Sequence, residues 1–297
     1  MITLASDFGS PYPAAMRGVL LRRTDARLVD VTHDLPRQDL RAAAFWLRET
    51  LPWFPPATHL AVVDPGVGTD RAAVVVEAGE HTLVGPDNGS LLPPARRLAA
   101  AGPPDPVPYR RFERAPGESG GDGDDTGDGD HGAEIAVYRV DDTGARSSTF
   151  HGRDVFAPVA ALVHDHPLAE LRDRGLLTPL ADPVSLSCPE PTVADDRATG
   201  EVLVVDDFGN LITNVPGHAL RGVERVGVRP AGAATGRDAP DTERVVPAVE
   251  TFEAVEPGEA LATVGSHGNV ELDVNRGRGD ERFGLTAGDG VTLVVDP

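Results

Sequence analysis

The sequence contains no lysine and only one cysteine, Cys188, among its 297 residues. Without lysine, enzymes that form a Schiff base, ordinary protein kinases and phosphate loops ending in G-K-[ST] are excluded. A single cysteine excludes an internal disulfide framework and any cysteine-rich zinc site. Chemistry that depends on lysine or on paired cysteines is therefore ruled out before any fold is considered.

Positive charge is also scarce, and all of it is arginine. The chain has 27 Arg against 30 Asp and 17 Glu, which gives a formal net charge of −20 and an isoelectric point near 4.7. This excess repels phosphate backbones and anionic lipids, so we expect no nucleic-acid partner and no electrostatic membrane docking. The absence of lysine and the abundance of aspartate are typical of a halophilic protein with an acidic surface, because salt screens the self-repulsion.

Long hydrophobic runs are missing as well. No stretch approaches the ~20 apolar residues that a membrane-spanning helix needs. The sequence enters its first apolar run, residues 2–4, without the basic region of a signal peptide. We therefore expect a cytoplasmic protein without a membrane partner, long enough for about two domains.

The first half of the chain alternates short apolar runs with helical patterns. Residues 2–6, 27–32 and 59–64 have the length and composition of buried strands. Residues 12–23 and 38–51 carry apolar side chains at helical spacing. This alternation predicts an α/β domain with a wound, mostly parallel sheet. It continues with expected strands at 72–77, 82–84 and 135–140 and a helix at 155–163.

A stretch rich in proline and serine, residues 179–191, separates this part from a different pattern. The remaining residues predict strands joined by turns, with little room for helices. We expect an N-terminal α/β domain at 1–185 and a smaller C-terminal all-β, barrel-like domain at 192–297. The expected strands of the second domain are 201–205, 211–215, 223–228, 245–252, 260–264, 269–274 and 290–295.

An acidic insert at about 115–133 interrupts the first domain. It has almost no apolar residue, so we expect it to be disordered. Asp122 and Asp124 fall near the spacing of a calcium loop, but the twelfth position is Ala133 rather than Glu. The histidines at 164 and 166 lack zinc-site spacing. No metal and no organic cofactor is predicted.

Polar residues follow the expected strands of the first domain. Asp7 and Asp64 stand where two of these strands end, and ligands of open parallel sheets bind at that edge. Arg71 follows Asp64 by seven residues, and His151 begins a later helix. Taken singly, a turn cap for Asp64, a surface charge for Arg71 and a helix cap for His151 remain open interpretations.

Five segments resemble the motifs of the S-adenosylmethionine hydroxide adenosyltransferases and occur in that family's order. They are SDFG at 6–9, VVDPGVGTDR at 62–71, GPDNG at 85–89, FHGRDVFAP at 150–158 and DDFGNLITN at 206–214. The segment GSHGNVELDVN at 265–275 resembles the family's C-terminal motif. The resemblance spans nearly the whole chain except the acidic insert. It implies an α/β domain, a C-terminal barrel-like domain and a homotrimer with active sites between subunits.

The reaction that this resemblance implies is hydrolysis of S-adenosyl-L-methionine at C5′ of the ribose, which yields adenosine and L-methionine. Methionine leaves as a neutral thioether, so the site must activate and aim water rather than protonate a leaving group. The resemblance assigns water activation to Asp64, Arg71 and His151, a set that the related halogenating enzymes lack. We expect Asp64 and His151 to hold the water and take its proton while Arg71 fixes the carboxylate.

The same resemblance implies how the substrate is bound. Asp7 matches the residue that holds the ribose hydroxyls, a role suited to a carboxylate that accepts from two donors. From the residues alone, a tight turn at 206–210 is an open alternative to a site. The other implied contacts are Asp206 and Asn210 with the methionine and adenosine portions, Ser266 near the methionine carboxylate, and Glu271 and Val274 at the adenine.

One departure from the family pattern concerns the amine of methionine. The family continues its first motif with a second aspartate that faces this amine, whereas residues 10–13, SPYP, carry no acid. Recognition of the amine therefore falls on Asp206 or on a neighbouring acid. Alternative functions are a halide-dependent 5′-halo-adenosine synthase, a non-catalytic adenosine or S-adenosylmethionine binding protein and, last, a metal-dependent hydrolase.

Overall fold

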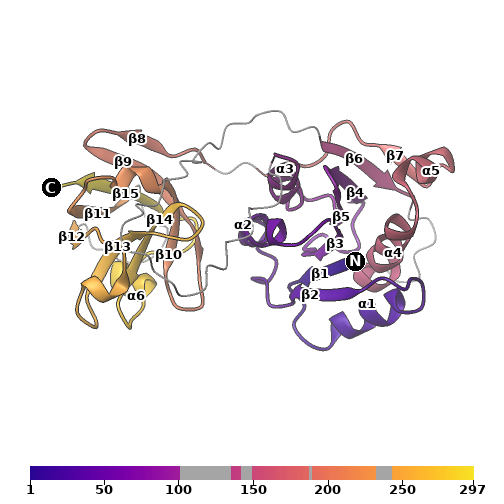
Figure 1. Cartoon of the computed structure of the whole chain (residues 1–297), viewed down its shortest axis with the longest axis horizontal. Helices are drawn as coiled ribbons and strands as arrows, with labels where there is room; N and C mark the ends of the chain where they lie inside the picture. Colours follow the sequence, from indigo (N-terminus) through magenta and orange to yellow (C-terminus); the bar gives the residue numbers. More distant parts are fainter. Residues whose placement is uncertain (101–134, 142–148, 187–188, 232–242) are drawn as a thin grey trace, which may run out of the picture. The chain divides into compact units, whose positions relative to one another are not determined.

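The computed structural model describes residues 1–100, 135–141, 149–186, 189–231 and 243–297 (Figure 1). The expected acidic insert and Cys188 lie outside these residues. Within the described residues the chain divides into two compact units, 1–186 and 189–297. Each unit is considered by itself below.

A mixed sheet forms the centre of the first unit, in the strand order β2-β1-β3-β5-β4-β6-β7 among the described residues. The pairs from β2 to β5 are parallel, and those from β5 to β7 are antiparallel. The antiparallel part begins because Gly79, at φ +60°, and Glu80 turn β4 directly into β5. The strands are β1 (Ile2–Ser6), β2 (Leu28–Thr32), β3 (Thr58–Val62), β4 (Ala73–Ala78), β5 (His81–Pro86), β6 (Ile135–Val140) and β7 (Leu177–Pro179).

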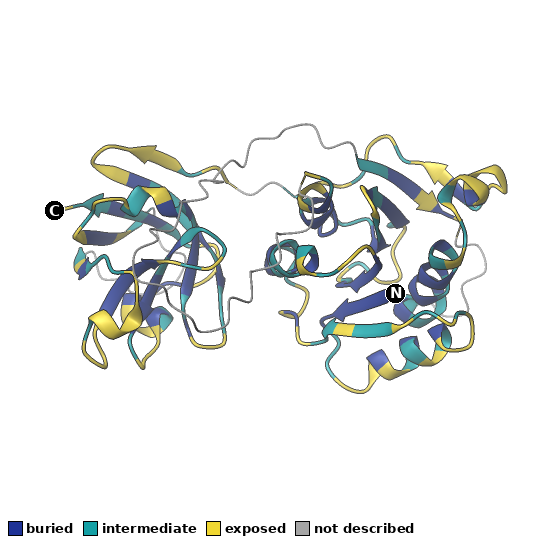
Figure 2. Cartoon of the chain, in the orientation of Figure 1, coloured by how far each residue is buried: buried dark blue, intermediate teal, exposed yellow. Residues whose placement is uncertain are grey.

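Helices cover both faces of this sheet, and the strands divide their side chains between them. Leu4 and Leu60 pack in one core with α1 and α4, whereas Ala5 and Ala61 pack in the other with α2 and α3. Successive strand residues point to opposite faces, which explains the division. Figure 2 shows both faces of the central strands as buried. The helices are α1 (Tyr12–Leu20), α2 (Leu40–Thr50), α3 (Leu92–Ala100), α4 (Ala157–Asp165) and α5 (Leu168–Asp173), with a 3₁₀ turn at Leu51–Trp53.

A nearly closed antiparallel sheet forms the second unit, in the order β12-β11-β15-β9-β10-β14-β13 with β8 beside β9. Ala248 bridges to Ala262, and the N–H of Val249 donates to the carbonyl of Ala262 at 2.9 Å, which joins the two ends of the sheet. The strands are β8 (Thr192–Ala194), β9 (Arg197–Val205), β10 (Leu211–Pro216), β11 (Arg225–Ala231), β12 (Arg244–Pro247), β13 (Ala260–Val264), β14 (Asn269–Val274) and β15 (Gly290–Val295).

The predicted fold class is confirmed: an α/β unit is followed by an all-β, barrel-like unit. Parallel pairing is confined to four strands of the first sheet, so the sheet is mixed. The strand expected at 245–252 is shorter, because β12 ends at Pro247 and a 3₁₀ turn follows at Phe252–Ala254. Helix α3 and the short elements α5, β7, β8, α6 (Gly279–Phe283) and the 3₁₀ turn Gly217–Leu220 were not anticipated. In the part of the chain that is described, no helix has the length and apolar character to cross a membrane.

Candidate active site

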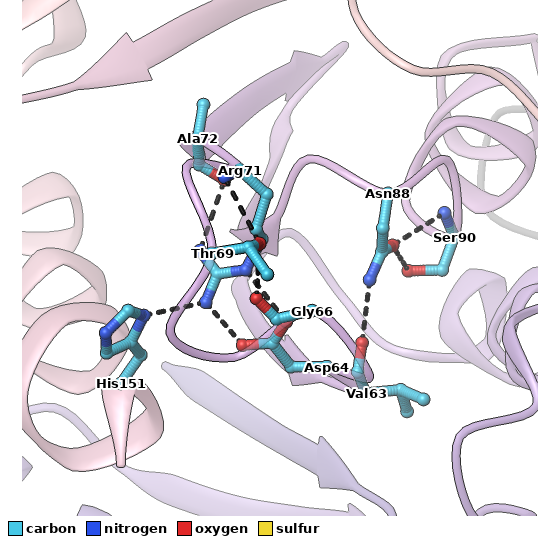
Figure 3. Close-up of polar contacts among 9 residues, drawn as sticks. All are labelled: Val63, Asp64, Gly66, Thr69, Arg71, Ala72, Asn88, Ser90 and His151. Atoms are coloured by element: carbon cyan, nitrogen blue, oxygen red, sulfur yellow. Dashed lines mark hydrogen bonds and ion pairs between the residues drawn. The ribbon is translucent and has the colours of Figure 1, made fainter. Parts of the chain in front are cut away.

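The turn that follows β3 folds Arg71 back over Asp64. The N–H of Val67 donates to the carbonyl of Asp64 at 3.3 Å, and Thr69 donates to the carbonyl of Gly66 through its N–H at 3.1 Å and its hydroxyl at 2.7 Å. Gly68 lies at φ +81°, a conformation that other residues rarely adopt. Gly68 therefore serves a tight turn that returns Arg71 to the end of the strand (Figure 3).

Arg71 and Asp64 form a two-point ion pair. The Nε of Arg71 donates to Oδ1 of Asp64 at 2.8 Å, and its Nη2 donates to Oδ2. The side chains are only 9% and 4% exposed, and the guanidinium carbon lies 4.9 Å from the ring centre of Phe156. A forked guanidinium fixes both position and orientation of a carboxylate. The surface-charge interpretation of Arg71 is therefore wrong.

His151 completes a group of three side chains. Nη2 of Arg71 lies 2.8 Å from Nδ1 of His151, although the residues are 80 positions apart (Figure 3). Arginine has donors and no acceptor, so Nδ1 of His151 must accept. The neutral imidazole then carries its proton on Nε2. The structure thus joins the predicted trio and fixes the histidine tautomer.

The backbone around His151 is unusual. His151 immediately precedes a π-helical turn, Gly152–Phe156, which leads into α4. A side chain at Gly152 would lie 2.8 Å from Sδ of Met16 and 3.1 Å from the rings of Phe8 and Phe150. Glycine lets this turn pack closely against α1, which positions His151. Single π turns are frequent at functional sites.

A second loop supports the end of β3. Nδ2 of Asn88 donates to the carbonyl of Val63 at 2.8 Å, and Oδ1 of Asn88 accepts from the hydroxyl of Ser90 at 2.7 Å (Figure 3). Gly85, on β5 just before this loop, must be glycine, since a Cβ there would lie 2.2 Å from the carbonyl oxygen of Ala61. The GPDNG segment therefore holds the residue that precedes Asp64. Asn88 was not among the predicted site residues, although the motif contained the signal.

Asp7 follows β1, the neighbour of β3, so both acids lie at the carboxyl edge of the parallel strands. Asp7 is 8% exposed, and its Oδ2 accepts from the N–H of Gln38 at 2.8 Å. Gln38 adopts φ +58°, a strained conformation for a residue other than glycine. The loop after β2 therefore orients the carboxylate of Asp7.

In the second unit, Asp206 organises its own loop. Its Oδ1 accepts from the N–H groups of Phe208 at 2.9 Å and Asn210 at 2.8 Å, and its Oδ2 accepts from Nδ2 of Asn210 at 3.0 Å. The turn interpretation of 206–210 therefore describes the local structure. Phe208 is exposed in this turn, and both Phe208 and Asn210 line a pocket.

This pocket has a volume of about 560 Å³. Two predicted binding residues, Asn210 and Val274, line it. Two exposed rings, Phe208 at 77% and Phe252 at 38%, stand at the same pocket and were not predicted. Phe208 belongs to the DDFGN motif, whereas nothing in the sequence marked Phe252. The remaining lining residues are Arg276, Gly277 and Arg278.

The other predicted binding residues of the second unit, Asp206, Ser266 and Glu271, are not among those that line the pocket. Ser266 is exposed in the turn between β13 and β14. Oε1 of Glu271 lies 2.8 Å from Nε2 of His267, so this acid already has a partner. The described residues contain no group of three or more histidine, cysteine or acidic side chains placed to hold a metal ion.

Comparison with known proteins agrees with the motifs. Residues 2–105 match the model of the SAM hydroxide adenosyltransferase N-terminal domain, and residues 200–292 match that of the C-terminal domain. The (R)-S-adenosyl-L-methionine hydrolase of Salinispora tropica is 38% identical, with 97% of this chain and 95% of that protein covered. The protein of the same name from Thermus thermophilus is also 38% identical, with 97% of each chain covered.

A solved structure shares the whole architecture. The crystal structure of an uncharacterized conserved protein from Thermotoga maritima has a TM-score of 0.75 and 26% identity, and the match covers 99% of this chain and 100% of that one. Family models, full-length relatives and fold all agree with the motif order. The chain belongs to the SAM hydroxide adenosyltransferase family.

Proposed function

We propose that this protein hydrolyses S-adenosyl-L-methionine to adenosine and L-methionine. The observation that carries the proposal is the contact of Arg71 with both Asp64 and His151, a partly buried arrangement suited to holding one water molecule. The full-length relatives, named hydrolases of the (R) epimer, support the same reaction. We extend their named substrate to this chain and propose the (R) sulfonium.

Asp64 is the base in this mechanism. Arg71 occupies one acceptor position on each oxygen of Asp64, and a carboxylate oxygen has a second position free for water. The water oxygen bonds to C5′ while the C5′–sulfur bond breaks and its electron pair stays on sulfur. The water proton passes to Asp64, and methionine leaves as a neutral thioether.

The role that we propose for His151 differs from the expected one, in which it shares the water proton with Asp64. Its Nδ1 lone pair is engaged by Arg71, so this nitrogen is not free to take a proton from water. Its Nε2–H is a donor and is suited to holding the water oxygen in line with C5′. We therefore assign proton acceptance to Asp64 alone and orientation of the water to His151.

The trio also favours water over halide as the nucleophile. A halide ion has no proton to give up and needs no base. The anion of Asp64 would repel a halide at the same position, whereas it attracts the hydrogens of water. If the nucleophile were a halide, Asp64, Arg71 and His151 would have no proton to remove and no water to orient.

The binding roles that we propose are given for each unit by itself. Asp7 suits the ribose hydroxyls, and the pocket with Phe208, Phe252 and Asn210 suits the planar adenine, because aromatic rings stack on bases. Asp206 and Ser266 remain assigned to the methionine end, as the family resemblance implies. We keep the proposed contact of Val274 with adenine. Glu271 would contact adenine through its backbone.

We also propose that the enzyme is a cytoplasmic homotrimer adapted to high salt. The trimer follows from family resemblance, and the salt adaptation follows from the net charge of −20 without lysine. Light scattering would give a mass three times that of the chain. Thermal unfolding should occur at higher temperature in molar KCl than in dilute buffer, because salt screens the repulsion between acids.

One experiment tests the reaction itself. The protein is incubated with each sulfonium epimer in ¹⁸O-labelled water, with and without chloride, and the nucleoside is identified by chromatography and mass spectrometry. We expect adenosine labelled at O5′ from the (R) epimer, and none above background from Asp64→Asn. Unlabelled adenosine, or 5′-chloroadenosine as the main product, would refute the proposal.

A further inference from the structure

The short helix α6 of the second unit contacts the loop that carries Phe208 and Asn210. The N–H of Asp280, in α6, donates to the carbonyl of Gly209 at 2.9 Å. Gly209 lies at φ +87°, and a Cβ there would lie only 2.8 Å from Oδ1 of Asp280. The 206–210 loop therefore packs directly on Asp280, with no room for a side chain between them.

Arg278 joins the same loop to the same acid. Its Nε and Nη2 donate to the two carboxylate oxygens of Asp280 at 3.0 and 2.8 Å. Such a two-point contact fixes the plane of the guanidinium. Its remaining nitrogen, Nη1, donates to the carbonyl of Asp207 at 3.2 Å. One guanidinium therefore bridges α6 and the 206–210 loop.

This bridge lies at the pocket of the second unit. Arg278 lines that pocket together with Phe208 and Asn210. A Cβ at Gly209 would lie 2.9 Å from Cβ of Arg278 and 3.0 Å from its Cγ, so the hydrocarbon stem of Arg278 also packs on the loop. Arg278 is therefore part of one wall of the pocket and holds the loop that forms the next.

The charge on Asp280 is what fixes Arg278 in this position. The hydrogen bonds from Arg278 lower the pKa of Asp280, although partial burial opposes this shift. Glu281 is a second acid near Arg278, but its Oε1 lies 3.7 Å from Nε of Arg278 and its side chain is 77% exposed. Exposed single contacts of this kind contribute little. Asp280 rather than Glu281 therefore orients Arg278.

We propose that Asp280 is a positioning residue for the adenine pocket: through Arg278 it holds the 206–210 loop in its binding shape. This inference rests on the proposed function, which assigns the pocket to the adenine of the substrate. A loop that is already held in its bound shape loses less conformational freedom when a ligand arrives, so the ligand binds more tightly. Asp280 has no part in water activation, and its effect should therefore fall on KM and not on kcat.

The kinetic test follows adenosine formation in wild-type protein and in Asp280→Asn, which keeps the size of the side chain and removes its charge. We expect KM to rise about fivefold or more, with kcat within about twofold of wild type. Glu281→Gln is the matched control, because it makes the same chemical change one residue away, at an exposed acid. It should leave KM as it is. An unchanged KM in Asp280→Asn, or an equal rise in Glu281→Gln, would overturn the proposal.

A double variant separates action through the loop from a general loss of structure. Phe208→Ala removes the ring that the loop contributes to the pocket, so a loop that is no longer held has less to lose. Adding Asp280→Asn to Phe208→Ala should therefore raise KM by no more than about twofold. A further rise by the full factor seen for Asp280→Asn alone would mean that the two residues act independently, which contradicts action through the loop.

Hydrogen exchange measures the loop itself, without substrate. The N–H groups of Phe208 and Asn210 donate to Oδ1 of Asp206 in the held loop. In Asp280→Asn these two amides should exchange at least about tenfold faster, whereas Glu281→Gln should leave their exchange unchanged. If Asp280→Asn does not fold, Arg278→Lys replaces it with the same expectations, because lysine keeps the charge and loses the two-point contact.

The possible failures can be told apart. If wild-type protein forms no adenosine, the proposed function fails and the role of Asp280 in substrate binding fails with it. If wild-type protein forms adenosine and Asp280→Asn shows neither faster exchange nor a higher KM, the role of Asp280 is refuted and the proposed function stands. Faster exchange with an unchanged KM also refutes it, since the pocket would then not depend on the held loop.

Discussion

Nη2 of Arg71 lies 2.8 Å from Nδ1 of His151, and this single contact decides which nitrogen of the imidazole carries the proton. A side chain that can only donate leaves the histidine no choice of tautomer. The same guanidinium holds Asp64 through two further N–H groups, so one arginine sets the geometry of both its neighbours.

Replacing His151 should separate orientation of water from proton acceptance. His151→Ala should lower kcat by about 100-fold, because the water loses its donor. His151→Gln should recover about a tenth or more of the wild-type rate, since its amide accepts from Arg71 and donates to water. Asp64→Asn should cost more than either, and adenosine formation at saturating substrate measures all three. Equal activity of the His151→Gln and His151→Ala proteins would contradict the assigned role.

Removing Arg71 should destabilise the protein as well as inactivate it. Arg71→Ala leaves the carboxylate of Asp64, 4% exposed, without its counter-charge, a loss of about 3–5 kcal/mol in the free energy of unfolding. Adding Asp64→Asn to Arg71→Ala should restore at least about 1 kcal/mol, because the buried charge is gone. Urea unfolding of the two variants provides the measurement. A double variant less stable than the single one would argue against a buried ion pair.

The two rings at the pocket should bind adenine without taking part in chemistry. Phe208→Ala and Phe252→Ala should each raise KM by about tenfold with little change in kcat, because stacking contributes equally before and during the reaction. Trp53→Ala is the matched control, since Trp53 is 65% exposed and lies in the first unit. A loss confined to kcat would show that the rings act on the reaction instead.

Stability should fall with acidity through a buried histidine of the first unit, His59. Burial, and secondarily His81, lower the pKa of His59 to about 3, against about 6.5 in an unfolded chain. Between pH 6.5 and about pH 3, His59 is protonated in the unfolded chain and neutral in the folded protein. The free energy of unfolding should therefore decrease as pH falls from 6.5, by up to about 1.4 kcal/mol per pH unit.

Urea unfolding at pH 7, 6 and 5 measures this slope. His59→Gln should flatten it, because glutamine can keep the contacts with Thr3 and His81 without titrating in this range. His218→Gln, at an exposed site, should leave the slope as it is. An identical slope in the His59→Gln protein would assign the acid sensitivity to other groups.

Strand positions could be predicted wherever burial imposes an apolar run. Strands β1, β6, β13, β14 and β15 begin and end as expected from sequence. Helix α3 was not anticipated; Pro93 and Pro94 lie in its first turn, where prolines are tolerated. The direction of β4 could not be predicted, since apolar content does not distinguish parallel from antiparallel pairing.

For the site, as for the strands, the sequence identified the residues but not how they pack together. Motif order was sufficient to select Asp64, Arg71 and His151, but their contact depends on how α4 packs, which the sequence does not reveal. In the segment VELDV, alternation predicts that Asp273 faces solvent on the outside of the sheet, whereas this acid is 0% exposed. Its burial results from packing on that face, so the acid was indistinguishable from a surface charge.

The bridge between Ala248 and Ala262 bears on the behaviour of this protein at high concentration. A free strand edge offers unpaired N–H and carbonyl groups to other chains, and repulsion between acids weakens in concentrated salt. By joining β12 to β13, the bridge removes two such edges from the second unit. β8 presents only three residues. Protection of these two edges thus comes from sheet closure, which salt does not screen.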